Sequence, residues 1–151
     1  MNKINYLELI KTADVYSVAE VSPLDYAKLI SANLNNKIFL KREDLQTTFS
    51  FKIRGAVNKI KNLDENALKN GVVCSSAGNH AQGVALASKL NKNRAVIVMP
   101  QTTPSIKIEA VKALGAEIII HGDNYDEAFS KAKEIEQSES LTFIHAFDDP
   151  Y

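Results

Sequence analysis

The second half of the chain alternates between short apolar runs and helix-like stretches, an order that few folds can accommodate. The apolar runs are rich in β-branched residues and cover residues 71–75 (GVVCS), 94–99 (RAVIVM), 117–121 (EIIIH) and 141–145 (LTFIH). Apolar strands that alternate with helices are typical of a parallel sheet covered on both faces. The sequence therefore predicts an α/β fold with an open parallel sheet and helices on both faces.

The stretches between these runs carry ordinary helix signals. The first is rich in alanine, and its Gly83 would permit close packing on the sheet. The second follows Thr103, a suitable N-cap residue, and Pro104, which suits the first helical position. The third follows Asn124, and the spacing from Asn124 to Glu127 matches a capping box. We expect three helices, one between each pair of successive strands.

The first seventy residues are less regular. We expect helices over residues 5–12 and 25–34, a strand over 37–41 and a helix over 51–61. The strand has no evident partner nearby in the sequence. The chain also stops at a turn signal, residues 148–151, directly after its last strand, although a parallel strand normally continues into a crossover helix. Both observations lead us to expect that part of the fold lies outside this sequence.

Composition narrows the classes of function. Basic and acidic residues balance at 18 each, without a block of like charges, so a nucleic-acid or membrane-surface role has no electrostatic support. No apolar run approaches the ~20 residues of a membrane helix, and residues 1–5 show no secretory signal. The single Cys74 cannot form an internal disulfide. We expect a cytoplasmic protein.

The first strand ends in a loop that could bind an anion. Residues 75–83 read SSAGNHAQG, where small residues precede a helix start whose free N–H groups and dipole favour a phosphate or carboxylate. A P-loop is excluded because Val84 and Ala85 stand where Lys and Ser or Thr are required, and no G-x-G-x-x-G occurs. A tight strand-to-helix turn without a ligand remains an equal alternative.

Lys52 also has two interpretations. It lies at the edge of an apolar helical stripe, where a lysine usually extends its amine to water. Alternatively, a desolvated lysine beside a second cation, Arg54, loses its proton more easily and can form a Schiff base with an aldehyde cofactor. The stripe consists of Ile53, Ala56, Val57 and Ile60.

The histidines give no metal pattern. His80, His121 and His145 lie at or near strand ends, but their spacing matches no zinc motif, and we expect no metal site. Cys74 is best interpreted as a small buried residue of the sheet.

Two long motifs resemble a known family. Residues 40–56 (LKREDLQTTFSFKIRGA) and 75–87 (SSAGNHAQGVALA) are similar to the fold-type II pyridoxal-phosphate enzymes, and within these to the threonine dehydratases, or threonine ammonia-lyases. The similarity continues through VIVMPQTTPSIKIEAVKALGAEIIIHGDNYDEA to FIHAFDDP, nearly to the end of the chain. Residues 15–24 (VYSVAEVSPL) resemble the biosynthetic branch, which begins isoleucine synthesis.

The resemblance implies a cofactor, pyridoxal 5′-phosphate, and a set of site residues. Lys52 would carry the cofactor as an imine and later act as the general base toward the substrate Cα, Phe51 would lie beside its ring, and Asn79 would bind its phenolic oxygen. The substrate would be L-threonine, with L-serine as the alternative, and the products from threonine would be 2-oxobutanoate and ammonia. The substrate carboxylate would be bound by the amides of Ser76, Ala77, Gly78, Asn79 and His80.

The chain departs from the family pattern in two respects. Thr47 stands where the family usually has proline, and the six glycines are all separated, so none forms the Gly-rich loop that holds the cofactor phosphate. We therefore expect an N-terminal fragment, with residues 1–50 belonging to an incomplete large domain and residues 51–151 forming the small domain. We expect the fragment to be inactive alone and the full-length protein to be a homo-oligomer.

Two alternatives stay open. A serine dehydratase or serine racemase relative would share the lysine motif. A non-catalytic α/β module that binds a small carboxylate or a partner protein would need no phosphate loop.

Overall fold

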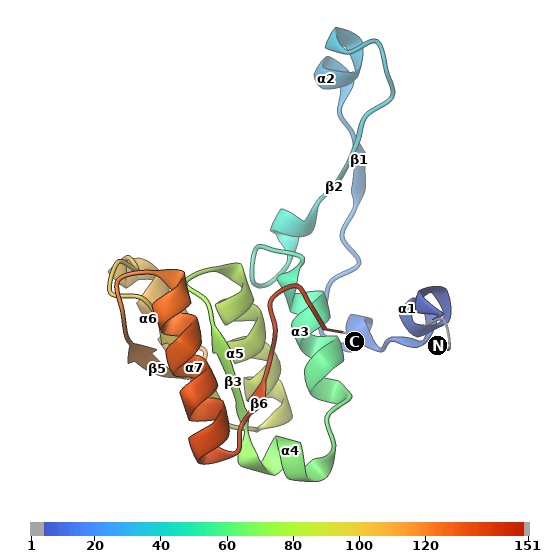
Figure 1. The fold of residues 1–151 in the computed structure, drawn as a ribbon. Helices are drawn as coiled ribbons and strands as arrows, with labels where there is room; N and C mark the ends of the chain where they lie inside the picture. Colours follow the sequence, from blue (N-terminus) through green and yellow to red (C-terminus); the bar gives the residue numbers. More distant parts are fainter. Residues whose placement is uncertain (1–4, 150–151) are drawn as a thin grey trace.

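A four-stranded parallel sheet forms the centre of the molecule (Figure 1). The computed structural model describes residues 5–149. The strands are β3 (Val72–Ser75), β4 (Ala95–Met99), β5 (Glu117–Ile120) and β6 (Thr142–Phe143), in the order β5-β4-β3-β6. All three pairings are parallel. The predicted α/β fold with an open parallel sheet is confirmed.

Helices cover both faces of this sheet, as predicted. On one face, α7 (Tyr125–Glu139) packs on Val73, Val96 and Val98 through its buried alanines. On the other face, α5 (Asn79–Asn91) and α6 (Ser105–Lys112) lie over the alternate side chains of the same strands. The alternation of buried residues between the two faces explains why β4 is apolar at every position and β3 at every position but its last.

Gly83 has a different partner from the one we expected. It does not serve close packing on the sheet but packing of α5 against α3 (Lys52–Lys61). A methyl group added at Gly83 would lie 3.2 Å from the Lys52 carbonyl oxygen and 3.4 Å from the Ala56 Cβ. The absence of a side chain therefore lets α5 approach the backbone of α3 at Lys52.

The helix starts follow the sequence signals in part. The Asn124 side chain accepts the Glu127 N–H (3.0 Å), which confirms the N-cap of α7, and the Glu127 carboxylate accepts the N–H of Asp123 (2.8 Å). The predicted cap of α6 is wrong by one residue, because Pro104 is the N-cap and its extended backbone directs the chain into the helix. The Thr103 hydroxyl is buried, and no residue within 5–149 forms a hydrogen bond with it. The short helix α4 (Glu65–Asn70), capped by Asp64, was not predicted.

A hairpin arm extends from this body (Figure 1). It consists of β1 (Leu24–Tyr26), α2 (Lys28–Asn33) and β2 (Phe39–Lys41), and β1 pairs with β2 antiparallel. The expected helix over residues 25–34 is therefore wrong at its start, and the predicted strand does have a nearby partner. Cross-strand contacts explain the difference: the rings of Tyr26 and Phe39 lie 5.3 Å apart.

The base of the arm is held by a buried polar network. Gln46, 1% exposed, accepts the Glu20 N–H (2.9 Å) and donates to the Glu20 carbonyl (2.8 Å) and the Glu43 carboxylate (3.3 Å). Glu43 in turn accepts hydrogen bonds from Ser22 and from Arg54 of α3. Residues 20–22 thus meet two parts of the sequence motif around residues 40–56 at one point, beside the start of α3.

The N-terminal helix α1 (Tyr6–Thr12) buries none of its residues. Residues 1–4 lie outside the described part of the chain, and so does the end of the predicted turn at residues 148–151. In the part of the chain that the structure describes, every helix is too short or too polar to cross a membrane.

Candidate functional site

Lys52 is the first residue of α3, and its amine is turned toward the end of the sheet. The Nζ donates a hydrogen bond to the carbonyl oxygen of Ala146 (2.6 Å). Ala146 lies in the segment after β6, two residues beyond the buried Ile144. It also lies 5.4 Å from the centre of the Phe51 ring. The four residues of the predicted apolar stripe are all buried, so Lys52 does lie at its edge. Its amine, however, contacts the protein instead of extending freely to water.

Three of the predicted site residues line one cavity. The cavity measures about 230 Å³, and Phe51, Lys52 and His80 contribute to its wall together with the segment that follows β6, which includes Ala146 and Phe147. Ser76, Ala77, Gly78 and Asn79 do not line it. Residues 76–78 form the adjoining loop between β3 and α5, and Asn79 is the first residue of α5, directly before His80.

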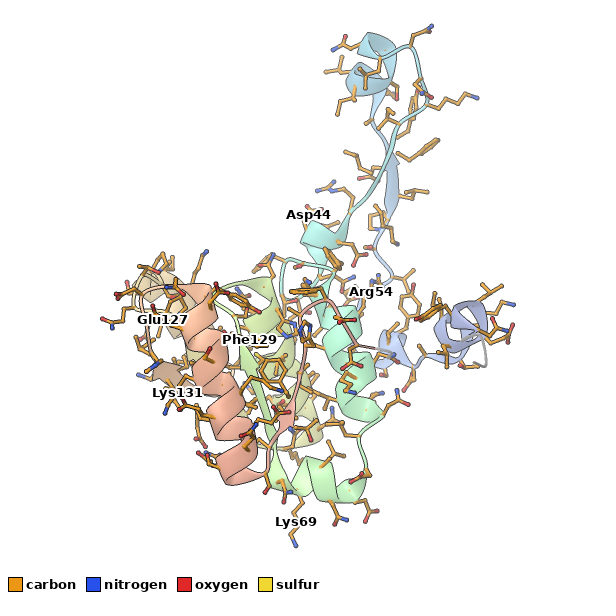
Figure 2. The ribbon with its side chains drawn as sticks, in the orientation of Figure 1. Asp44, Arg54, Lys69, Glu127, Phe129 and Lys131 are labelled. Carbon is orange, nitrogen blue, oxygen red and sulfur yellow. The ribbon has the colours of Figure 1, made fainter. Side chains whose placement is uncertain are left out.

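Arg54 does not act as an uncompensated charge beside Lys52. Its guanidinium forms two hydrogen bonds of 2.8 Å with the carboxylate of Glu43, and it stacks on the ring of Tyr16 at 5.1 Å. The guanidinium lowers the pKa of Glu43 to about 2, mainly through these hydrogen bonds. Figure 2 shows Arg54 at the junction of α3 and the arm. We therefore assign Arg54 to the anchoring of the arm. The hypothesis that its charge promotes the loss of a proton from Lys52 loses its support.

The loop before α5 presents some of its amides and uses others internally. The Ser76 N–H donates to the Val98 carbonyl (3.1 Å), and the Gly78 N–H donates to the Ser76 hydroxyl (3.2 Å). Within residues 5–149, the amides of Ala77, Asn79 and His80 have no protein acceptor. The N–H groups at a helix start point along the axis and carry partial positive charge. Three of the five predicted amides are therefore available for an anion.

His80 is buried, with 6% of its surface exposed. Its Nε2 lies 3.0 Å from the carbonyl oxygen of Ile144. Burial lowers the pKa of His80 below its ordinary value, and the charge of Lys52 acts in the same direction, although the hydrogen bond to Ile144 opposes both. The neutral imidazole is the form that fits this position.

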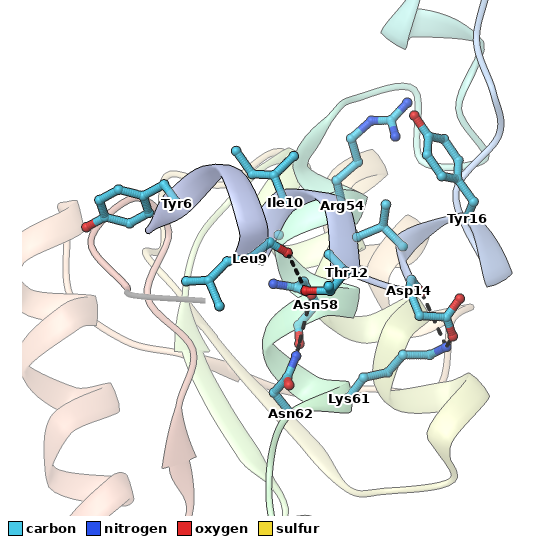
Figure 3. Close-up of a pocket in the computed structure, with 13 residues that line it drawn as sticks. Tyr6, Leu9, Ile10, Thr12, Asp14, Tyr16, Arg54, Asn58, Lys61 and Asn62 are labelled. Carbon is cyan, nitrogen blue, oxygen red and sulfur yellow. Dashed lines mark hydrogen bonds and ion pairs between the residues drawn. The ribbon is translucent and has the colours of Figure 1, made fainter. Parts of the chain in front are cut away.

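A second and larger cavity, of about 820 Å³, lies between α1 and the adjacent face of α3 (Figure 3). Its one lysine, Lys61, forms an ion pair with Asp14 (2.5 Å) and also donates to Ser17. The partner of Lys61 is thus a carboxylate, whereas the acceptor for Lys52 is a neutral carbonyl. The smaller cavity is therefore the better candidate for amine chemistry.

The contribution of the segment after β6 could not be found from residue types. Ala146 acts through its backbone carbonyl, which any residue would supply. His145 accepts the amides of Phe147 (3.4 Å) and Asp148 (3.0 Å), which forms a turn beside the cavity, and Asp149 pairs with Lys59 of α3 (3.1 Å). The carboxyl ends of neighbouring parallel strands meet at one edge, but only the structure shows that β6 neighbours β3.

The remaining candidates have simple structural roles. Cys74 is buried in β3, and burial raises the pKa of its thiol far above the ordinary value, so the prediction of a buried sheet residue is confirmed. In the described part of the chain, His, Cys, Asp and Glu side chains form no group of three that could hold a metal ion.

The model of one protein family matches residues 17–151, which is most of the chain. That family is described as "Pyridoxal-phosphate dependent enzyme". The chain belongs to this family. The match includes Lys52, the loop before α5 and the segment after β6, so every part of the candidate site lies within the pyridoxal-phosphate dependent enzyme region.

Similar curated proteins are threonine dehydratases. The biosynthetic L-threonine dehydratase IlvA of Pasteurella multocida is 50% identical over 145 residues, which cover 96% of this chain and 28% of the relative. The chloroplastic biosynthetic threonine dehydratase of Arabidopsis thaliana is 52% identical over 147 residues, 97% of this chain and 25% of the relative. The chain thus spans only 24% to 30% of the length of curated threonine dehydratases such as these.

Solved structures of proteins with similar sequences confirm the fold. Threonine deaminase isoform 2 from Solanum lycopersicum superposes with a TM-score of 0.92 at 49% identity, over 96% of this chain and 42% of that one. Maize serine racemase gives a TM-score of 0.89 at 34% identity, over 94% of this chain and 44% of that one.

Proposed function

We propose that this chain provides the lysine-bearing part of a threonine dehydratase that converts L-threonine into 2-oxobutanoate and ammonia. The observation that carries the proposal is the position of Lys52, whose amine borders a cavity and contacts a neutral carbonyl. The similarity to threonine dehydratases at about half identity supports the choice of substrate.

The residues present fit pyridoxal phosphate at its aldehyde end. We assign Lys52 to the aldehyde carbon, Phe51 to one side of the ring and Asn79 to the phenolic oxygen. The exposed Asn79 side chain at the start of α5 is available for such a contact. When bound, pyridoxal phosphate supplies an electron sink for the negative charge that develops at the substrate Cα.

The start of α5 is the proposed binding site for the substrate carboxylate. The amides of Ala77, Asn79 and His80 are available to donate hydrogen bonds, and the helix dipole favours an anion at this point. Because the Ser76 amide is already bonded to Val98, Ser76 would contribute through its hydroxyl, and Gly78 through its small size. A carboxylate held here would orient the rest of the substrate.

Lys52 has a second proposed role, the removal of the Cα proton. Its Nζ lies on the side of α3 that faces the cavity, and its side chain is long enough to leave the Ala146 carbonyl and return. A base must reach the proton it abstracts within hydrogen-bond distance. Loss of the β-hydroxyl from threonine then gives an enamine, which hydrolyses to 2-oxobutanoate and ammonia.

We also propose that residues 1–50 belong to a larger second domain and residues 51–151 to the small one. The exposed apolar side chains of the hairpin arm support this division, because contiguous apolar surface usually marks an interface (Figure 2). These side chains belong to Leu24, Tyr26, Leu29, Ile30, Leu34, Phe39 and Leu40.

We place the proposed reaction at the start of isoleucine biosynthesis, because the relatives are named biosynthetic threonine dehydratases. We also propose a cytoplasmic homo-oligomer, although the names of the relatives support neither the location nor the oligomeric state. We expect the activity to require more than residues 1–151. A serine racemase or serine dehydratase is the second candidate, favoured by the 34% identity to maize serine racemase.

Borohydride trapping tests the role of Lys52. The chain is incubated with pyridoxal phosphate, reduced, digested and mapped by mass spectrometry. We expect the pyridoxyl adduct on Lys52, with Lys59 and Lys61 of the same helix as internal controls. An adduct mainly on either control lysine would contradict the assignment, and the absence of any adduct would favour a non-catalytic module.

A chimera tests the reaction. The matched 145 residues of the Pasteurella multocida enzyme are replaced by the corresponding part of this chain, and the products from L-threonine and L-serine are measured. We expect 2-oxobutanoate from threonine and none in the Lys52→Ala chimera. A folded, cofactor-loaded chimera that prefers serine would favour the second candidate, and one that releases no keto acid would refute the proposed function.

A further inference from the structure

Helix α5 contacts the two segments that the hydrogen bond of the Lys52 amine joins. At one end, Gly83 lies against the backbone of Lys52, so α5 fixes where α3 begins. At the other end, His80 binds the carbonyl of Ile144, two residues before the carbonyl that accepts the Lys52 amine. His80 and Gly83 are three positions apart and therefore lie on the same face of α5.

The segment between the two carbonyls is restrained from several sides, through the turn at His145 and the ion pair of Asp149 with Lys59. Strand β6 ends at Phe143, and the Ile144 amide makes the last ladder bond, to the Val73 carbonyl (2.9 Å). Ile144 itself is 2% exposed, whereas Phe147 is 80% exposed. The hydrogen bond from His80 connects α5 to this segment at the point where the chain leaves the sheet, two residues before Ala146.

The chemistry of this contact defines the state of His80. A carbonyl oxygen accepts and cannot donate, so Nε2 must carry the proton. The buried imidazole donates this proton to Ile144 without taking a second one at neutral pH, because burial disfavours the charged form. A side chain with an N–H at the same distance from the backbone could replace it, and an apolar side chain could not.

We infer that His80 is a positioning residue for Lys52: its hydrogen bond to Ile144 directs the Ala146 carbonyl at the Lys52 amine and keeps that amine at the mouth of the cavity. The inference deepens the proposed function, since it rests on Lys52 being the reactive amine. It concerns the side chain of His80, whereas the carboxylate site uses its backbone amide.

Three substitutions separate this role from general packing. His80→Gln places an amide N–H near the position of Nε2. His80→Asn places an amide N–H near the position of Nδ1, and its side chain is too short to reach Ile144. His80→Leu removes the donor. Trace labelling of the chain with acetic anhydride, without cofactor, is followed by mass spectrometry. The measured quantity is the labelling of Lys52 relative to Lys69, an exposed lysine on α4 at the far end of the body (Figure 2).

The expected result is rescue by glutamine alone. Loss of one ordinary hydrogen bond should raise the relative labelling of Lys52 by about fivefold in His80→Asn and His80→Leu, whereas His80→Gln should match the wild type. Circular dichroism and urea unfolding are recorded for each variant. If His80→Leu fails to fold, the comparison between glutamine and asparagine decides.

Two results would overturn the inference: equal Lys52 labelling in folded wild type, His80→Asn and His80→Gln, or a rise in His80→Gln as large as in His80→Asn. Failure of the proposed function is seen separately. A pyridoxyl adduct on Lys59 or Lys61 would refute the role of Lys52, and the cofactor-free labelling would still report whether His80 positions its amine.

Discussion

Gly83→Ala should weaken the contact that places Lys52. In the structure, the new methyl group would lie 3.2 Å from the Lys52 carbonyl oxygen and 3.3 Å from its carbonyl carbon. Both atoms belong to the backbone of α3, so they cannot rotate away as the end of a flexible side chain could. Helices α3 and α5 must separate by a few tenths of an ångström, and this shift occurs at the residue that carries the proposed chemistry.

The net cost follows from two opposing terms. Overpacking in a well-packed region costs about 1–3 kcal/mol, and replacing glycine by alanine inside a helix returns about 0.5–1 kcal/mol. We expect Gly83→Ala to be destabilised by about 1 kcal/mol, which lowers Tm by about 3 °C for a chain of this size. The fraction of pyridoxyl adduct on Lys52 should fall in parallel.

Gly55→Ala is the matched control. Gly55 lies in α3 itself, and a methyl group there would meet no heavy atom of residues 5–149 within 4 Å, apart from its chain neighbours and the backbone of its own helix. The same substitution should therefore stabilise the chain by about 0.5–1 kcal/mol. Urea unfolding of both variants at pH 7 measures the difference. If Gly83→Ala is as stable as Gly55→Ala, then α5 does not press on the Lys52 backbone and the packing argument is refuted.

Three further predictions concern single side chains. Asn79→Ala should weaken pyridoxal phosphate binding by about 1–3 kcal/mol in a spectroscopic titration, and unchanged affinity would exclude the proposed contact with the phenolic oxygen. The ionised Glu43 should stabilise the fold by up to about 3 kcal/mol above pH 4.5, since its pKa is lowered from 4.5 to about 2 in the folded state. This stabilisation should be lost as the pH falls from 4.5 to about 2. Urea unfolding of Glu43→Gln at each pH should show no such loss. Because the folded-state pKa of His80 lies below its ordinary value of 6.5, stability should decrease as the pH falls below 6.5, and an equally steep decrease in His80→Gln would contradict this origin.

The sequence was sufficient for the elements whose signal is local. The strands of the parallel sheet are apolar at consecutive positions, and Asn124 and Glu127 form the expected cap. The stripe that leaves Lys52 at its edge was also predicted correctly. In each case, the residue types themselves determine the outcome, because burial and capping depend on side-chain chemistry.

The features that were missed depend on distant partners. The three-residue strand β1 was assigned to a helix because its identity as a strand comes from pairing with β2, and local propensity is weak over so short a segment. Gly83 was assigned to the sheet because a sequence does not say which element an alanine-rich helix contacts. The carbonyl of Ala146 has no signature in residue type at all.

The hydrogen bond between Lys52 and Ala146 joins positions 94 residues apart in the chain. During synthesis, α3 leaves the ribosome well before its partner, at ordinary elongation rates of about 5–20 residues per second. Strands β3, β4 and β5 are already present when β6 emerges, and β6 adds to the open edge of the sheet beside β3. For several seconds, the amine of Lys52 therefore lacks the carbonyl that accepts its hydrogen bond in the folded chain. The nascent chain thus contains the proposed cofactor lysine before it contains the segment that restrains this lysine.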